Sequence, residues 1–352
     1  MKTHYKGLDV LRALAVFLVI IWHWESKSFF LNQINIGEIG VNVFFVLSGY
    51  LITGILLKLK NSSEKNIWNH FKIFYIRRTL RIFPVYYITI LFFSFLIVRY
   101  HHNEVGKLLY LYTYTANYYF YFHQGWDGMI SHLWSLAVEE QFYLFWPFAI
   151  LLVNNRYISI ILWIAILVGL ISRIYFSFFN LSLVYPHLTN ILIPTVLDTF
   201  GIGGLLAYKE SINFDFKKYF TKWTIVLIIG VCLMLLFFSK ADENFILNRT
   251  CISVLSILLI VFLKKEVLSK YLEKAGFLVY SGKISYGLYL YHNFIGLFNN
   301  SLLIKFKWLN ILCQQYQLLF FVIDLCLLYV IASLSYFVIE LPFLRLKNRF
   351  DY

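Results

Sequence analysis

Charged side chains are scarce in this sequence. Asp, Glu, Lys and Arg together make up 14% of its 352 residues, against about 25% in a typical soluble domain. Hydrophobic residues reach 60% and aromatic residues 20%. A water-soluble domain of this length needs a polar surface that such a composition cannot supply. The scarcity of charge therefore excludes a soluble enzyme, a secreted module and a disordered chain, and predicts an all-α bundle that crosses a membrane many times.

Neither paired cysteines nor a cleavable leader is expected. The four cysteines lie in apolar runs without CxxC spacing, which argues against a disulfide or a metal site; they are Cys232, Cys251, Cys313 and Cys326. The first apolar run follows two lysines, as in a signal peptide. It contains Arg12 and His23, however, and has no small-residue cleavage site. We therefore expect a retained first span.

Long apolar runs separated by charged or turn-rich breaks predict ten membrane-spanning helices. One crossing needs about 20 apolar residues, so ten crossings fill most of the chain. The predicted ranges are 8–25, 38–58, 82–100, 132–153, 157–178, 190–208, 223–239, 250–263, 283–300 and 317–340. The sequence is read as one domain over 1–352, with no internal repeat and no appended soluble domain.

The distribution of positive charge predicts the orientation of these spans. With the N-terminus inside, 22 of the 31 lysines and arginines fall in cytoplasmic segments and seven in outer ones, which is the bias of multi-pass membrane proteins. Both termini are then expected in the cytoplasm. The net charge of +13 follows from this bias and does not indicate a nucleic-acid partner. Only the segment 74–81 is basic enough to bind an anion or lipid headgroups.

Ionisable residues within the predicted spans need a partner or a role, because each costs at least about 2.5–3.5 kcal/mol to insert. The first helix carries two, Arg12 and His23. Eleven residues at 100° per residue return to the same face, about 16 Å further along the axis. Arg12 would then lie toward the cytoplasm and His23 near the outer surface. The plainer alternative is that Arg12 snorkels and His23 is an interfacial histidine.

The fourth predicted helix places four polar side chains on one face, since helical neighbours recur every three to four residues. They are His132, Ser135, Glu139 and Tyr143. Glu139 would lie at nearly the depth of His23, and the two could form an orienting pair with the imidazole as base. The alternative is that Glu139 only stabilises the positive start of its helix.

Other polar or aromatic residues in the spans and outer loops could have a structural or a functional role. Asp198 precedes a glycine-rich stretch that lets helices approach closely, and packing does not explain the carboxylate. His292 is as well explained by a structural hydrogen bond as by function. The aromatic stretch 110–126 predicts an interfacial belt, or a surface on which a sugar stacks.

Six sequence blocks, taken in order, resemble the acyltransferase 3 family of integral membrane enzymes. They are Gly7 to His23, Gly40 to Thr53, Arg77 to Pro84, Trp134 to Tyr143, Ser285 to His292, and Glu340-Leu341-Pro342. The family moves acyl groups, often acetyl, onto cell-surface glycans and other small acceptors. The resemblance implies a multi-pass enzyme of the bacterial cytoplasmic membrane that takes its acyl group from acyl-coenzyme A, with no metal.

The resemblance also implies roles for single residues. His23 matches the histidine taken as catalytic, Arg12 its partner, and Glu139 the carboxylate of the tryptophan-serine-leucine block. Arg78 and Arg81, with Arg77 beside them, match the basic motif associated with the donor. Substrate-binding roles are predicted for Trp134, Ser135, Asp198, Tyr286 and His292.

The sequence leaves several functions open. His23 could deprotonate the acceptor hydroxyl or carry the acyl group covalently. The donor could be succinyl or a longer acyl group, and a lipid-linked glycan flippase also has polar groups in its bundle. Some relatives end in a soluble hydrolase-like domain, so this chain either acylates a glycan or glycolipid itself or hands the acyl group to a separate extracytoplasmic protein.

Overall fold

The fold is known from a computed structural model. It describes residues 5–25, 35–62, 66–100, 106–128, 130–179, 185–214, 222–238, 246–264, 274–305, 312 and 315–350. Cys313 lies outside these residues, and the other three cysteines are free thiols.

The described chain is helical and contains no strand. Its longer helices are α1 (Lys6–Glu25), α2 (Ile36–Lys60), α3 (Ile67–Tyr100), α6 (Leu133–Leu151), α7 (Ile158–Phe179), α8 (Ile193–Ser211), α10 (Lys222–Phe238), α11 (Asn248–Leu263), α14 (Ser285–Lys305) and α16 (Gln317–Ser335). Shorter elements are α4 (Gly106–Tyr112), α5 (Ala116–His123), η3 (Asn155–Tyr157), η4 (Pro186–Ile191), α13 (Gly276–Lys283), η5 (Tyr336–Glu340) and α17 (Leu341–Lys347).

Each of the ten predicted ranges overlaps one of the long helices, so the all-α prediction is confirmed. Four stretches of the described residues are long and apolar enough to cross a membrane: Lys6–Trp24, Ile36–Lys60, Asn155–Phe179 and Gln317–Lys347. One boundary differs markedly from the prediction. The third helix was expected from residue 82, because the preceding segment is rich in basic and polar residues, but α3 begins at Ile67.

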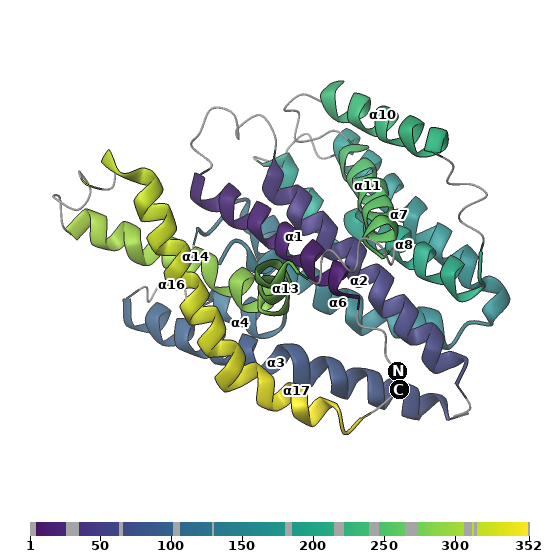
Figure 1. The fold of residues 1–352 in the computed structure, drawn as a ribbon, viewed down its shortest axis with the longest axis horizontal. Coiled ribbons are helices and arrows are strands. Elements are labelled where there is room, and N and C mark those ends of the chain that lie inside the picture. The colour runs from purple at the N-terminus through teal and green to yellow at the C-terminus, as the bar shows by residue number, and fades with distance from the viewer. Residues whose placement is uncertain are drawn as a thin grey trace.

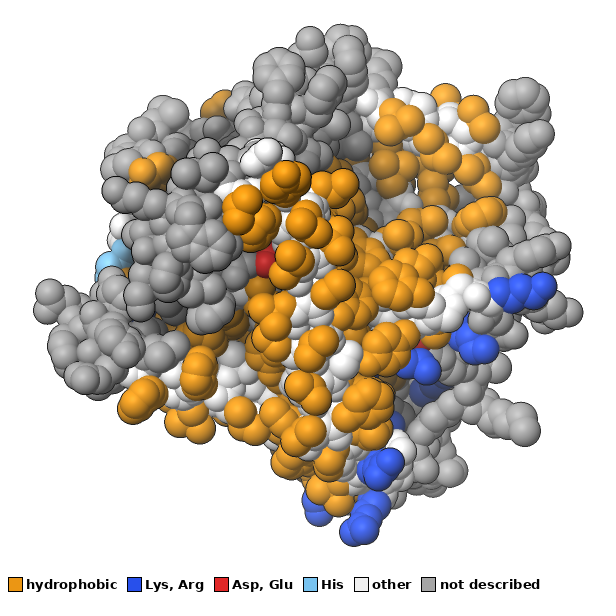
Figure 2. Space-filling view, turned by 60° about the vertical axis from the view of Figure 1, so that its left-hand side comes forward, with side chains coloured by type: hydrophobic (Ala, Val, Ile, Leu, Met, Phe, Trp, Pro, Cys, Tyr) orange, Lys and Arg blue, Asp and Glu red, His pale blue; other side chains and the backbone are white. Residues whose placement is uncertain are grey.

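The outer surface of the bundle is strongly apolar. On α16, Leu318 is 77% exposed and Val338, just beyond this helix, is 70% exposed; α3 and α7 expose Phe95 and Phe179 to a similar degree. Figure 2 shows hydrophobic side chains over most of the described part of one face, with Lys and Arg confined to an edge. Such a surface is not stable in water but suits lipid. The protein is therefore an integral membrane protein.

The helices pack around α1 and α2, which cross the middle of the molecule (Figure 1). On one side α2 packs against α8, and α8 against α7 and α11; on the other, α1 packs against α13 and α14, and α14 against α16. The helix α17 returns along α3. This arrangement surrounds α1 and α2 with helices from both halves of the chain.

Glycines allow the closest of these contacts. A Cβ atom at Gly203 of α8 would lie 2.1 Å from the carbonyl oxygen of Val46, and one at Gly49 of α2 would lie 2.2 Å from that of Phe200. A Cβ at Gly282 would lie 1.9 Å from the carbonyl oxygen of Asp9. Small residues at such crossings let backbones touch, which is how helices gain packing energy in lipid.

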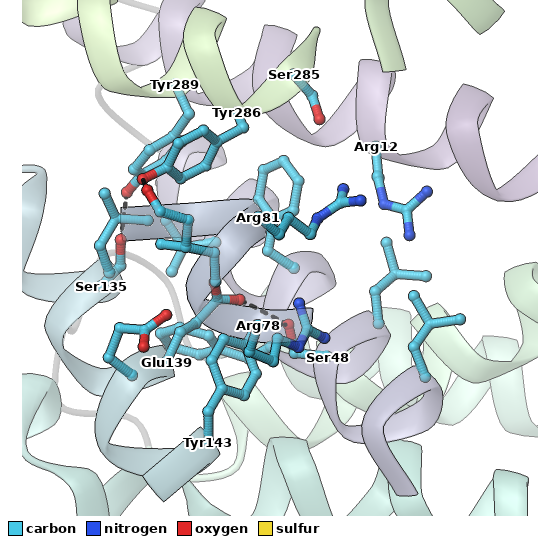
Figure 3. Close-up of a pocket in the computed structure, with 18 of the residues that line it drawn as sticks. Arg12, Ser48, Arg78, Arg81, Ser135, Glu139, Tyr143, Ser285, Tyr286 and Tyr289 are labelled. Atoms are coloured by element: carbon cyan, nitrogen blue, oxygen red, sulfur yellow. Dashed lines mark hydrogen bonds between the residues drawn. The ribbon is translucent and has the colours of Figure 1, made fainter. Parts of the chain in front are cut away.

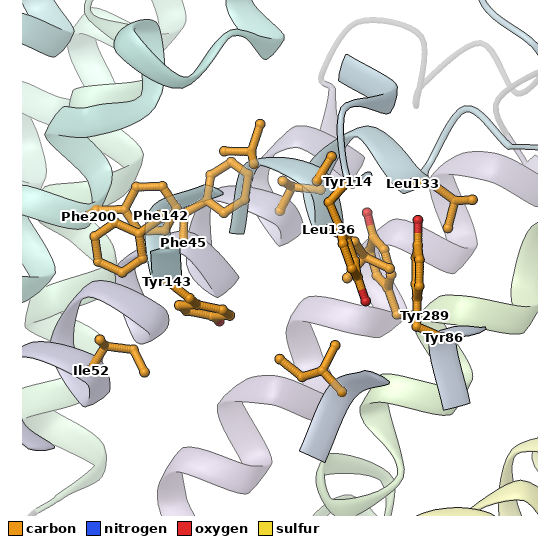
Figure 4. Packing of buried hydrophobic residues seen from close by; sticks show 14 of the residues in the cluster. Phe45, Ile52, Tyr86, Tyr114, Leu133, Leu136, Phe142, Tyr143, Phe200 and Tyr289 are labelled. Atoms are coloured by element: carbon orange, nitrogen blue, oxygen red, sulfur yellow. The ribbon is translucent and has the colours of Figure 1, made fainter. Parts of the chain in front are cut away.

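Aromatic side chains fill the space between α2, α6 and α8. The rings of Phe142 and Phe200 stack with centroids 4.0 Å apart, and Phe45 lies 5.0 Å from Phe200 (Figure 4). A second stack joins Tyr86 of α3 to Tyr114, with centroids 4.2 Å apart. The first cluster packs α6 against α8, beside α2, and the second holds α3 against the segment between α4 and α5. The helix α6 carries several of the predicted site residues.

Candidate active site

Three guanidinium groups converge on a cavity of about 300 Å³, here called the arginine cavity. Arg12 comes from α1, and Arg78 and Arg81 come from successive turns of α3 (Figure 3). The other polar residues of the wall are Ser48, Arg77, Ser135, Glu139, Glu140, Tyr143, Ser285, Tyr286, Tyr289 and Lys347. A cluster of guanidinium groups attracts phosphate oxygens, which it can bind through paired charge-assisted hydrogen bonds.

Two of these arginines are held in place by neighbouring side chains. Arg12 Nη1 donates to Asp9 Oδ1 at 2.7 Å, one turn earlier on the same helix. The guanidinium of Arg78 lies over the ring of Tyr143, 4.4 Å from its centroid, in a cation–π contact. Arg12 and Arg78 are partly accessible and Arg81 is exposed, so all three can still meet a ligand.

Arg77 is held differently from the other arginines. Its side chain is buried, and Nη1 donates to the carbonyl oxygens of Lys347, at the end of α17, and of Phe350, just beyond it. Arg77 thereby anchors the end of the described chain against α3. The predicted donor-binding role fits Arg78 and Arg81 better than it fits Arg77.

Glu139 ends a chain of hydrogen bonds in the arginine cavity. Ser48 Oγ donates to Glu139 Oε1 at 2.8 Å. Ser48 has only one proton, so the phenol of Tyr143 is the donor in its 2.9 Å contact with Ser48 Oγ. Of the four side chains that the sequence placed on one helical face, Ser135, Glu139 and Tyr143 line this cavity, and His132 does not.

A second cavity, of about 320 Å³, lies around His23 and is here called the histidine cavity. Its wall contains Trp22, His23, Asn35, Gly37, Glu38, Val41, Trp126, Ser131, His132, Trp134, His187, Asn190, Ile191, Arg249 and Tyr289. Indole rings, amides and one ion pair dominate this wall. Flat apolar rings combined with hydrogen-bonding groups suit a ligand that is both apolar on its faces and rich in hydroxyls.

The hydrogen bond of His23 defines which ring nitrogen carries the proton. Nδ1 lies 2.8 Å from the carbonyl oxygen of Val19. A carbonyl can only accept, so Nδ1 donates and Nε2 keeps its lone pair. The side chain is exposed and lines the cavity, as a general base must. The orienting role that the sequence suggested for Glu139 is filled by a backbone carbonyl.

Two further histidines adjoin His23. The ring of His292 lies 4.8 Å from that of His23 and 4.9 Å from that of His132, both edge-on. His132 is fully bonded: Nε2 donates to the carbonyl of Leu290, and Nδ1 accepts from Asn293 Nδ2 at 3.0 Å. His292 Nδ1 donates to the carbonyl of Tyr289 at 2.6 Å. Of the three, only His23 and His132 line the histidine cavity.

The two cavities share part of their walls. Val41 of α2 and Tyr289 of α14 line both. Tyr289 is held by its phenol, which hydrogen-bonds to Ser135 Oγ and to the carbonyl oxygen of His132. The arginine cavity and the histidine cavity are therefore adjacent chambers with this pair between them.

Other predicted site residues lie as follows. Trp134 lines the histidine cavity, and Ser135 and Tyr286 line the arginine cavity. His292 is fully buried beside His23. Asp198 lines neither cavity: it is fully buried and forms an ion pair with Arg173.

The expected pairing of His23 with Glu139 is not formed in the described structure. His23 lines the histidine cavity and Glu139 the arginine cavity, because α6 enters the bundle with His132 toward one chamber and Glu139 toward the other. Helix depth alone does not reveal which chamber a side chain faces.

Sequence reasoning did not assign Ser48, Tyr289 or the ion pair of the histidine cavity. In that pair Arg249 Nη2 lies 3.0 Å from Glu38 Oε1. Ser48 lies in a block that supports the family resemblance, and this was the one available signal for it. No group of His, Cys, Asp and Glu side chains suited to a metal ion occurs among the residues that the structure describes.

Membrane helices around an arginine cavity and a histidine cavity define an integral membrane protein with an enzyme-like site. Comparison with known proteins is consistent with that class: the family model described as an acyltransferase domain matches residues 5–340. The chain belongs to this acyltransferase 3 family, and the resemblance seen in its sequence blocks is confirmed.

Two curated relatives from Staphylococcus aureus illustrate the similarity. A protein of strain COL with a provisional O-acetyltransferase name is 34% identical over 96% of this chain and 57% of its own length. The O-acetyltransferase OatA of strain NCTC 8325 is 32% identical over 96% of this chain and 56% of its own length. The chain thus spans a little over half the length of these relatives. No solved structure matches.

Proposed function

We propose that this chain is an O-acyltransferase of the bacterial cell membrane. It moves an acyl group, acetyl in the first place, from cytoplasmic acyl-coenzyme A to a hydroxyl of an extracytoplasmic glycan or glycolipid. The observation that carries the proposal is the pair of adjacent chambers. One is rich in guanidinium groups, and the other contains a histidine whose Nε2 can accept a proton. The family membership and the O-acetyltransferase names of the relatives support it.

The proposed orientation has ten spans with both termini in the cytoplasm. The excess of lysine and arginine in the segments assigned to the cytoplasm supports it. In this orientation the start of α1 and the end of α17 face the cytoplasm, and both reach the arginine cavity through Arg12 and Lys347. The phosphates of coenzyme A would meet Arg78 and Arg81 there.

The histidine cavity is the proposed acceptor site. Its wall combines Trp22, Trp126 and Trp134 with Asn190 and the Glu38–Arg249 pair. Indole rings can stack on the apolar face of a sugar ring while the polar groups bind its hydroxyls. Trp126 is the one residue of the aromatic stretch 110–126 among the lining residues of this cavity, and sugar stacking is proposed for Trp126 alone.

Transfer would proceed in one step. The acceptor oxygen attacks the thioester carbonyl carbon, a C–O ester bond forms and the C–S bond breaks. The hydroxyl proton passes to His23 Nε2 and from there to the departing thiolate, which leaves as coenzyme A. The hydrogen bond from His23 Nδ1 to Val19 keeps the imidazole in the tautomer that this step needs.

A pair of histidine variants tests the proposal. His123 donates Nδ1 to the carbonyl four residues earlier, as His23 does, but is exposed and lines neither cavity. We expect His23→Gln to lower transfer by roughly 10²–10⁴-fold, and His123→Gln to leave it unchanged. The readout is the ester content of surface glycans, by mass spectrometry, in cells lacking the gene and restored with each variant.

Two results would contradict the proposal. One is full ester content with a correctly inserted His23→Gln protein. The other is a normal degree of esterification with a changed amount of surface glycan on deletion, which would indicate transport of the glycan instead.

A further inference from the structure

Two side chains, Val41 and Tyr289, separate the two chambers, and an acyl group would have to pass between or beside them. Val41 is buried and so is Tyr289, and both face the arginine cavity on one side and the histidine cavity on the other. We infer that Val41 and Tyr289 form a partition that the acyl group crosses, and that this partition limits the length of the acyl chain transferred. The inference rests on the proposed function.

The chemistry of the two chambers requires such a crossing. The guanidinium groups lie in one chamber and His23 Nε2 in the other. Attack needs the acceptor oxygen within about 3–3.5 Å of the thioester carbon. A donor held by its phosphates in the arginine cavity meets that condition only if its acyl end reaches past the shared wall.

The approach to the partition suits a hydrocarbon. Besides its polar groups, the arginine cavity is lined by aliphatic and aromatic side chains, namely Val41, Phe44, Phe45, Leu47, Leu51, Ile55, Ile82 and Leu136. Phe44 lies one turn beyond Val41 on α2 and stands edge-on to Tyr289, with ring centroids 6.0 Å apart. An acyl chain would therefore contact Val41 from an apolar side.

The Tyr289 side of the partition is held by polar bonds. Its phenol bonds to Ser135 Oγ and to the carbonyl oxygen of His132, both on or next to the first turn of α6. Removing the phenolic oxygen leaves the ring in place but frees it from α6. Val41 has no such bond, so its contribution to the wall is steric only.

The experiment measures which acyl chain is transferred. Purified protein in lipid vesicles receives acetyl-, propionyl- and butyryl-coenzyme A in competition with a soluble oligosaccharide acceptor, and ester products are separated by mass. Because one methylene changes discrimination in an apolar pocket by about tenfold or more, we expect Val41→Ala to raise the butyryl-to-acetyl ratio by about tenfold. Tyr289→Phe should raise the same ratio, and Val41→Leu should lower it.

Matched controls lie on the same helices or make the same kind of bond. Val43→Ala removes the same atoms from a buried position of α2 that lines neither cavity. Tyr280→Phe removes a phenol that donates to Ser333 Oγ at 2.7 Å, away from both cavities. Both controls should keep the wild-type ratio.

The outcomes separate this inference from the proposed function. The partition alone is overturned if Val41→Ala and Tyr289→Phe give the same butyryl-to-acetyl product ratio as the controls while transfer still depends on His23. Absence of transfer from every donor in the wild-type protein, or full transfer by His23→Gln, overturns the proposed function.

Discussion

Arg173 of α7 and Asp198 of α8 form a buried, two-pronged ion pair. Nη1 lies 2.6 Å from Oδ1 and Nη2 lies 2.8 Å from Oδ2, and Thr250 Oγ1 of α11 donates to the same Oδ2. The side chains are 4% and 0% exposed. A Cβ at Gly169 would lie 2.6 Å from the backbone nitrogen of Asp198, so the pair lies at a close crossing of the two helices.

Breaking that pair should destabilise the protein. Asp198→Asn leaves the guanidinium without its countercharge, and removal of one partner of a buried pair costs about 3–5 kcal/mol. We expect a large drop in the thermal midpoint of the detergent-solubilised protein. The double variant Arg173→Met/Asp198→Leu should recover part of the loss, since it buries no unpaired charge. A midpoint in Asp198→Asn equal to that of Arg156→Met, which alters an exposed arginine on η3, would refute this.

Arg78 and Arg81 should act on the donor. Arg78→Ala/Arg81→Ala removes two groups that would bind phosphate, each such bond being worth about 1.5–3 kcal/mol. We expect the KM for acyl-coenzyme A to rise by at least about tenfold, with a smaller change in the KM for the acceptor. Steady-state kinetics in vesicles measure both constants. Arg156→Ala is the control, and an equal rise in the two KM values would count against a donor site.

Arg77 should affect stability more than donor binding. It is buried and donates to carbonyl oxygens of Lys347 and Phe350. Arg77→Gln should therefore expose the segment after α17 to limited proteolysis while the KM for the donor changes less than in the Arg78 and Arg81 variant. An unchanged proteolysis pattern together with a raised KM for acyl-coenzyme A would indicate that Arg77 binds the donor.

The α2–α8 crossing should not tolerate a methyl group. Gly203→Ala places Cβ against the backbone of Val46 at 2.1 Å, so the helices must separate. We expect lower yield and a lower thermal midpoint. At Gly230 of α10, a Cβ would meet no neighbouring heavy atom within 4 Å, so Gly230→Ala should be neutral or stabilise by up to about 1 kcal/mol. Equal midpoints in the two variants would show that the crossing is looser than described.

Ser48 links Tyr143 to Glu139, and its removal should weaken catalysis or donor binding without unfolding the protein. In Ser48→Ala the Glu139 carboxylate loses its 2.8 Å bond, and a bond to a charged group contributes about 1.5–3 kcal/mol. We expect kcat/KM to fall by about tenfold or more. Ser256→Ala, which removes a hydroxyl that donates to the carbonyl oxygen of Ile252 on its own helix, is the matched control.

Hydrophobic runs in the sequence predicted the helices well, because the period and length of an apolar run determine a helix in lipid. They did not predict the early start of α3, where basic residues resemble a loop but belong to a helix packed on α17. The same limit applies to pairing. Arg173 and Asp198 were both visible in the sequence, yet only the packing of α7 on α8 joins them.

The site was predictable as a set of residues but not as two chambers. Periodicity grouped His132, Ser135, Glu139 and Tyr143 on one face, and the last three of them line the arginine cavity. It could not show that His132, at the start of the same helix, faces the other chamber, because that depends on how α14 approaches with Tyr289. Nor could it show that Val19 orients His23.

The helix α1 carries Arg12 into one chamber and His23 into the other, eleven residues apart on one rigid rod. That spacing is about 16 Å along the axis. A donor whose phosphates bind Arg12 can present its thioester at His23 only if the distance between its phosphates and its thioester matches this spacing. Inserting one alanine between these residues would lengthen the spacing by only about 1.5 Å but rotate His23 about the helix axis by about 100°. An insertion in α1 would therefore disturb the direction in which His23 points more than its distance from Arg12.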